Sequence, residues 1–262
     1  MPEQFQLAAG SMVGRDHRLV FRNNQDAYHV ATYDGLTIAV VADGCGSGSK
    51  SEVGAQLGVR IVAEQIARRY AAYRSIDWAR LEQSVVSQLD ILASNLGGDY
   101  RRTVEEHLLF TLVGVVLTRE EAVFFACGDG VVYVNGEPTI LGPHPGNMPP
   151  YVAYRLLASE LRINPDEVRL RPVITAPIET VNSFLIGTDG VDDIIRRADR
   201  NLPGLERPVG EISQFWSDDR YFKGNPDLVS RQLRLMGRDY PHVNPDHGLL
   251  SDDTTLIVGR RA

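Results

Sequence analysis

Five short acidic motifs are spread along this 262-residue chain, and they constrain its fold more than any other feature. They are Asn24-Gln25-Asp26, Asp43-Gly44, Gly128-Asp129-Gly130, Thr188-Asp189-Gly190 and Asp252-Asp253-Thr254-Thr255. Three of them border apolar, β-branched runs of the kind found in buried strands, at 36–42, 122–126 and 184–187. A carboxylate at the end of a buried strand is costly unless something positive lies beside it. We therefore expect several strands to bring their aspartates to one point.

Carboxylate and backbone carbonyl oxygens are the ligands that Mg²⁺ and Mn²⁺ prefer. The five motifs together therefore predict a metal centre. Each motif alone has a plainer interpretation as a turn, because Asp-Gly is among the commonest turn dipeptides.

Composition excludes several other classes of protein. The net charge of −7 leaves no basic footprint for nucleic acid. The N-terminus does not read as a signal peptide, and the longest apolar stretch, 108–117, is too short to span a membrane. Two cysteines do not make a disulfide framework. We expect a cytoplasmic protein with no nucleic-acid or membrane partner.

The spacing of apolar residues predicts the order of the elements. Strands are expected at 5–13, 26–33, 36–42, 109–117, 122–127, 131–134, 138–141, 168–175, 180–186 and 254–259. Asp34-Gly35 and Asn135-Gly136 are hairpin turns in this interpretation. Helices are expected after a capping box at Ser49–Glu52, at 78–96, at 151–161, and two or three times within 191–237.

Hairpins thus alternate with pairs of helices, which favours antiparallel sheets covered by helices over a parallel, doubly wound sheet. The first and last strands both adjoin acidic motifs, so we expect the two ends of the chain in the same sheet system. The chain then forms a single domain over 1–262.

The motifs resemble, in the same order, those of the protein phosphatase 2C family of metal-dependent serine/threonine phosphatases, in its bacterial-type branch. The resemblance covers residues 10–259. It implies an α+β fold, a four-layer αββα sandwich in which two antiparallel sheets pack face to face with helices on both outer sides. It also implies two ions, Mn²⁺ or Mg²⁺, that activate a water for in-line attack on phosphorus.

The resemblance assigns the ligands as follows. Asp43 would bridge the two ions, with the Gly44 carbonyl on the second. Asp189 and Asp252 would complete the shell of the first ion, and Asp26 would hold waters on the second ion. Asp253 stands where the family usually has Asn. Asp252 is therefore the expected ligand, and Asp253 is the alternative. Asp129 and Asp193 match positions that hold a third, looser ion in bacterial members. Asp193 and its neighbour Asp192 could equally be first-turn helix residues favoured by the helix dipole.

Two departures from the family pattern concern the phosphate and its leaving group. The better-known members carry a phosphate-clamping Arg where this chain has Phe21, so Arg18 or Arg22 would take that role, unless both are surface residues. Cys45 stands where many eukaryotic members have His, so the leaving group's proton would come from water or from another residue such as His17. His17 could also be a turn histidine. Cys45 and Cys127 are inert small side chains or, alternatively, a redox-sensitive pair.

The predicted function is Mn/Mg-dependent hydrolysis of phosphoserine and phosphothreonine in proteins, opposing a bacterial-type protein kinase. A hydrolase of small phosphoesters could use the same centre. A phosphatase-like sensor or binding module is the non-enzymatic alternative, but it would lack the ligand aspartates, and all the main ones are present. Residues 142–164 are expected to form a flap beside the substrate, carrying Tyr151 and Tyr154; the alternative is a connecting helix whose aromatic stripe is core.

Overall fold

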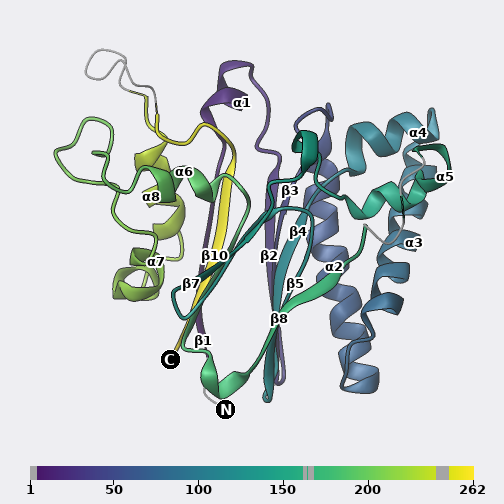
Figure 1. Ribbon diagram of the computed structural model, residues 1–262, viewed down its shortest axis with the longest axis horizontal. Helices are drawn as coiled ribbons and strands as arrows, with labels where there is room; N and C mark the ends of the chain where they lie inside the picture. The colour runs from purple at the N-terminus through teal and green to yellow at the C-terminus, as the bar shows by residue number, and fades with distance from the viewer. Residues whose placement is uncertain (1–4, 162–163, 165–167, 240–247) are drawn as a thin grey trace.

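Two five-stranded antiparallel sheets form the centre of the molecule (Figure 1). The computed structural model describes residues 5–161, 164, 168–239 and 248–262. The first sheet has the order β1 (Phe5–Met12), β10 (Thr254–Arg261), β9 (Ser183–Gly187), β6 (Gly130–Val134), β7 (Glu137–Leu141). The second has the order β2 (Asp26–Tyr33), β3 (Leu36–Asp43), β4 (Leu112–Leu117), β5 (Glu121–Cys127), β8 (Arg171–Pro177).

Helices cover both outer faces, which confirms the four-layer αββα sandwich (Figure 1). The second sheet is covered by α2 (Ser51–Tyr73), α3 (Trp78–Leu96), α4 (Tyr100–Thr103), η1 (Val104–Leu108), η3 (Val152–Leu156) and α5 (Ala158–Leu161). The first sheet is covered by α6 (Val191–Arg196), α7 (Gln214–Ser217) and α8 (Leu228–Met236). The remaining short helices are α1 (Arg15–Leu19), η2 (Pro145–Asn147), η4 (Ile178–Thr180) and η5 (Asp219–Tyr221).

Strand β3 shows how the layers pack. Its side chains alternate between faces, as in any strand. Ala39 and Val41 enter the core between the sheets, whereas Ile38, Val40 and Ala42 pack toward the α2 and α3 layer. All five are buried, so the continuous apolar run in the sequence reflects a strand covered on both sides.

The two hairpin predictions and the pairing of the chain ends are confirmed. Asn135 and Gly136 both have positive φ, 53° and 88°, as a two-residue type I′ turn requires. Asp34-Gly35 joins β2 to β3, with Gly35 at φ 73°. β1 pairs with β10 along its whole length, and the start of β1 and the end of β10 lie at the end of the sandwich opposite α1 (Figure 1).

Several local predictions were wrong. The capping box does not form: α2 begins at Ser51 after Lys50, with no side-chain cap, and Glu52 accepts a hydrogen bond from Asn23 instead. The strand expected at 109–117 begins at Leu112, and before it Phe110 forms only an isolated bridge with Gly44. The helix expected at 151–161 is a 3₁₀ turn followed by a short α-helix. In the described part of the chain, no helix is long and apolar enough to cross a bilayer.

Candidate metal centre

Hydrogen-bond register brings the acidic motifs to one end of the sandwich. Asp26 opens β2 and Asp43 ends β3, and the two residues are direct partners in the antiparallel ladder. Asp129 lies in the turn between β5 and β6, Asp189 follows β9, and Asp252 precedes β10. Because neighbouring strands are antiparallel, the start of one strand lies beside the end of the next, at the same end of the sheet.

Burial raises the pKa of the aspartates in this cluster, and neighbouring carboxylates raise the pKa of Asp43 and Asp189 further. Burial is the largest cause for Asp43, followed by the negative charges of Asp26, Asp189, Asp252 and Asp129, and its pKa is well above the usual range. Burial, then Asp252 and Asp129, raises the pKa of Asp189 to about 7. Burial likewise raises the pKa of Asp129 and Asp252. When they are ionised together these carboxylates repel one another, and a cation among them would remove that repulsion.

Two buried oxygens point to the same conclusion. Asp26 Oδ1 and Asp189 Oδ1 have no hydrogen-bond partner within the described residues. The other oxygen of Asp26 accepts a hydrogen bond from Thr188 Oγ1, at 2.8 Å. A buried oxygen without a donor is costly, and a divalent ion would satisfy it. The donor set therefore fits Mg²⁺ or Mn²⁺.

The carboxylates do not close around an ion by themselves. In the described ranges, no three His, Cys, Asp or Glu side chains are gathered tightly enough to hold one metal ion. Backbone oxygens and waters would have to complete the shell, as is usual for Mg²⁺. The Gly44 carbonyl belongs to the residue after Asp43 and is a donor of this kind.

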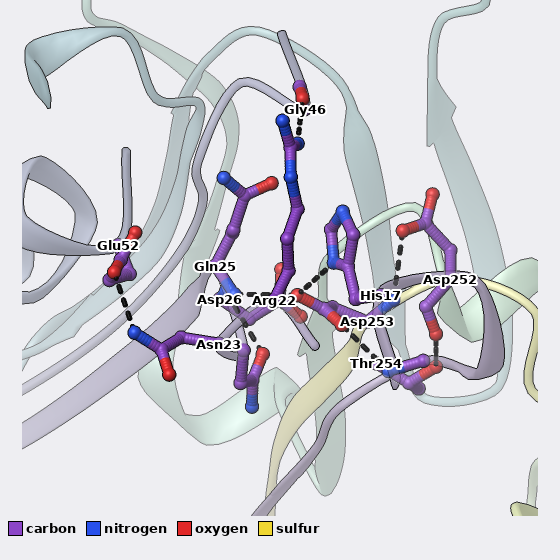
Figure 2. A network of polar contacts seen from close by, with 12 residues as sticks. His17, Arg22, Asn23, Gln25, Asp26, Gly46, Glu52, Asp252, Asp253 and Thr254 are labelled. Carbon is purple, nitrogen blue, oxygen red and sulfur yellow. Dashed lines mark hydrogen bonds and ion pairs between the residues drawn. The ribbon is translucent and has the colours of Figure 1, made fainter. Parts of the chain in front are cut away.

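Asp253 has a structural role that separates it from its neighbour Asp252 (Figure 2). Its side chain is 2% exposed, and its two oxygens accept hydrogen bonds from the backbone N–H of Gly14, at 2.6 Å, and of Gln25, at 2.5 Å. These bonds fasten the starts of α1 and β2 to the start of β10. Asp252 accepts one bond, from the Asp253 N–H. Asp252 is therefore the freer carboxylate of the pair.

The turn after β9 is fitted closely to this region. A Cβ on Gly190 would lie 2.0 Å from the Asp253 carbonyl oxygen, so a larger residue would push the turn outward. The Thr188 hydroxyl, besides its bond to Asp26, accepts the Thr255 N–H at 3.0 Å. The sequence motif includes Thr188 without predicting this role, and the hydroxyl directly before Asp-Gly is the signal for it.

Asp193 lies beside Asp252, whose pKa its negative charge helps to raise, but its carboxylate is already engaged. Its carboxylate pairs with Arg197 and accepts hydrogen bonds from the Ser251 N–H, at 2.6 Å, and hydroxyl. Asp192 pairs with Arg196 on the same helix. Between α6 and β7, a cavity of about 300 Å³ opens beside the cluster. It is lined by Asp129, Asp189, Asp192, Ile140, Pro143 and Ile195, among others.

A family model described as Protein phosphatase 2C matches residues 13–229. The chain belongs to the protein phosphatase 2C family. It is accordingly an enzyme, a metal-dependent serine/threonine protein phosphatase, and the family's ions are Mn²⁺ or Mg²⁺. A search of curated protein sequences gives no match.

Solved structures share the fold at low sequence identity. A bacterial serine phosphatase is 15% identical, with a TM-score of 0.54 over 98% of this chain and 97% of its own. The serine/threonine phosphatase Stp1 from Staphylococcus aureus is 14% identical, with a TM-score of 0.53 over 99% of this chain and 96% of its own. PppA, a regulatory component of T6SS in Pseudomonas aeruginosa, is 21% identical, with a TM-score of 0.51 over 99% of each chain.

The two candidate phosphate-binding arginines have different surroundings. Arg18 donates to the Gly237 carbonyl at 2.7 Å and pairs with Asp239, on the side of α8. Arg22 is exposed and donates to the carbonyl of Gly46, in the loop that follows Asp43 (Figure 2). Arg22 is the arginine that borders the carboxylate cluster.

His17 sits against the buried Asp253 (Figure 2). Its Nδ1 lies 2.9 Å from Asp253 Oδ2, although the atoms are not aligned as a hydrogen bond. The contact with Asp253 argues against the alternative interpretation of His17 as a solvent-facing turn residue.

The two cysteines differ, and both are free. Burial raises the pKa of Cys127 to about 12, and its thiol faces the Pro150 carbonyl. Burial alone would raise the pKa of Cys45, but hydrogen bonds with Ser47 and Tyr151 lower it overall. A redox role for the pair stays a prediction.

The aromatic stripe of the expected flap is largely core. Tyr151 is buried with Leu157 in the cluster formed by α2, α3 and the second sheet, and Tyr154 packs against it. On α3, the buried Glu82 pairs with Arg155 at 2.7 Å, which anchors this turn. Whether residues 142–164 also border the substrate stays a prediction.

Proposed function

We propose that the enzyme hydrolyses phosphoserine and phosphothreonine in proteins, with Mn²⁺ or Mg²⁺ bound at the carboxylate cluster. The observation that carries this proposal is the gathering of Asp26, Asp43, Asp129, Asp189 and Asp252 from separate parts of the chain. Two of their buried oxygens have no donor among the described residues. The family match supports the reaction class.

We assign the ion-binding roles on the same basis. Asp43 has the other four carboxylates as its charged neighbours, so it is the residue to bridge two ions. Asp189 and Asp252 would complete the first ion's shell. Asp26 and the Gly44 carbonyl would serve the second, Asp26 through waters. Bound there, the ions supply a nucleophilic water and neutralise charge on the phosphoryl oxygens.

A third, looser ion would lie toward Asp129, which borders the cavity. Arg197 and Ser251 contact the Asp193 carboxylate. Asp193 could bind this ion only after its carboxylate left these two partners. We therefore place Asp129 ahead of Asp193 as a ligand.

Arg22 is our candidate for holding the substrate phosphate. Its guanidinium reaches the loop after Asp43, and it has solvent on its other side. A guanidinium can grip two phosphate oxygens in a bidentate arrangement. Arg18 would have to leave the Gly237 carbonyl to do the same.

His17 is our candidate for the proton that the leaving hydroxyl needs. Asp253 Oδ2 lies 2.9 Å from its Nδ1, and a carboxylate in that position would orient the ring and favour its cationic form. In the doubly protonated ring, Nε2 carries the proton that can be given to the departing oxygen. Water is the alternative donor.

The physiological setting is also a proposal. The substrates would be phosphoproteins, including a serine/threonine kinase or its targets. We place the enzyme in the cytoplasm, because Cys45 and Cys127 are unpaired, as is usual in a reducing compartment.

Phosphate release from a phosphothreonine peptide tests the proposal. We expect EDTA to abolish turnover, added Mn²⁺ or Mg²⁺ to restore it, and Asp43→Asn to stay inactive at every ion concentration. Asp16→Asn is the matched control, because Asp16 is an exposed aspartate on α1 outside the cluster. Hydrolysis that resists EDTA would contradict the metal role, and turnover of p-nitrophenyl phosphate without any of the peptide would favour small phosphoesters.

A further inference from the structure

Three consecutive large apolar residues are exposed at the end of α1. Leu19 is 66%, Val20 63% and Phe21 97% exposed, and Phe21 is the most exposed large apolar side chain of the described residues. We call residues 19–21 the apolar tip. Single exposed apolar side chains are ordinary, but a run of three in one turn is a patch that binding would cover.

The backbone holds Phe21 outward. Its φ is +57°, in the left-handed region that bulky residues rarely adopt. The turn is fixed by hydrogen bonds from the N–H of Phe21 to the Arg18 carbonyl and from the N–H of Arg22 to the His17 carbonyl. A strained residue that gains no packing in return is characteristic of a functional position.

The apolar tip is attached to the border of the metal centre on both sides. On its N-terminal side, the Gly14 N–H is bound to Asp253, next to Asp252. On its C-terminal side, Arg22 reaches the Gly46 carbonyl in the loop after Asp43. α1 therefore stands at the same end of the sandwich as the carboxylates (Figure 1).

We infer that the apolar tip docks a phosphoprotein substrate by covering an apolar side chain close in sequence to its phosphorylated residue. The inference rests on the proposed function. The tip directly precedes Arg22, whose exposed guanidinium bonds to the loop after Asp43 and complements the negative charge of a phosphate. A small ester such as p-nitrophenyl phosphate has no flanking residue for the tip to cover.

The test compares phosphothreonine peptides that carry either Leu or Ser at one flanking position, with p-nitrophenyl phosphate as the small substrate. We expect Phe21→Ser to lower kcat/KM about tenfold for the Leu peptide that wild type prefers, a typical value for losing one apolar contact. The Ser peptide and p-nitrophenyl phosphate should stay within about twofold. Phe21→Leu should rescue most of the loss. Tyr73→Ser is the control, because Tyr73 is 69% exposed at the far end of the 23-residue helix α2.

The outcomes separate the two proposals. Equal losses on all three substrates, or no loss on any, would overturn the docking inference while leaving the proposed function intact. Wild type that hydrolyses p-nitrophenyl phosphate but neither peptide would overturn both. A wild-type dimer that Phe21→Ser dissociates, seen by sedimentation, would assign the tip to a second copy of this chain and overturn the inference.

Discussion

Replacing Asp189 with Asn should stabilise the metal-free protein, and the gain should depend on pH. The folded-state pKa of Asp189 is raised from 3.8 to about 7, chiefly by burial and then by Asp252 and Asp129. In the unfolded chain the group ionises near its ordinary pKa. The folded state therefore loses stability as pH rises from about 4 to about 7, because it must hold a proton that the unfolded chain releases.

The size of the effect follows from the shift. About three pKa units at 1.36 kcal/mol each give roughly 4 kcal/mol for the isolated group at pH 8. Neighbouring aspartates titrate in the same range and share this cost, so we expect a gain of about 2 to 4 kcal/mol in unfolding free energy. For a chain of this length that corresponds to a Tm higher by about 5 to 10 °C.

The assay is urea and thermal unfolding of wild type and Asp189→Asn in EDTA, at intervals from pH 4 to pH 8. The difference should be small near pH 4 and grow toward pH 8. Saturating Mn²⁺ should make wild type the more stable of the two proteins, because folded wild type binds the ion more tightly than the folded variant does. A variant that is less stable than wild type at pH 8 in EDTA, or a difference that does not change with pH, would refute the reasoning.

Three further predictions concern activity and packing. Asp43→Asn should remove all turnover and keep the native circular dichroism spectrum, and near-normal turnover would show that Asp43 does not bridge ions. Arg22→Ala should raise KM for a phosphopeptide about tenfold or more, against about twofold or less for Arg18→Ala, and the reverse order would make Arg18 the clamp. Tyr151→Ala should lower the unfolding free energy by about 3 kcal/mol, because the ring is buried, and Tyr154→Ala should lower it less. An unchanged Tm, with a loss of turnover confined to phosphopeptides, would instead support the flap role.

The strands and their hairpins could be predicted because their signals are local. Alternation or a continuous apolar run identifies each strand, and Asn135-Gly136 has the residue types that its turn demands. The helix at 78–96 was correct at both ends, because Asp77 caps its first turn and Gly97 ends it. The predicted start of α2 was wrong, because Glu52 accepts a hydrogen bond from the distant Asn23 rather than from the N-terminus of its own helix.

In the metal centre too, local features could be predicted from the sequence, and features that depend on distant residues could not. Asp26 and Asp43 could be placed together from the sequence, because one hairpin makes them ladder partners. The residues alone could not separate Asp252 from Asp253, and only the family resemblance ordered them. The physical difference is that Asp253 accepts hydrogen bonds from the N–H groups of Gly14 and Gln25, more than 200 residues earlier in the chain. The choice between Arg18 and Arg22 likewise depends on tertiary neighbours.

The most direct measurement is the anomalous difference map of a crystal grown or soaked with Mn²⁺, recorded near the manganese absorption edge. The account predicts strong peaks beside the Asp43 carboxylate, with Asp189 and Asp252 on one ion and the Gly44 carbonyl on another. Density at saturating Mn²⁺ that shows no peak at Asp43, or peaks elsewhere on the molecule alone, would contradict the metal centre.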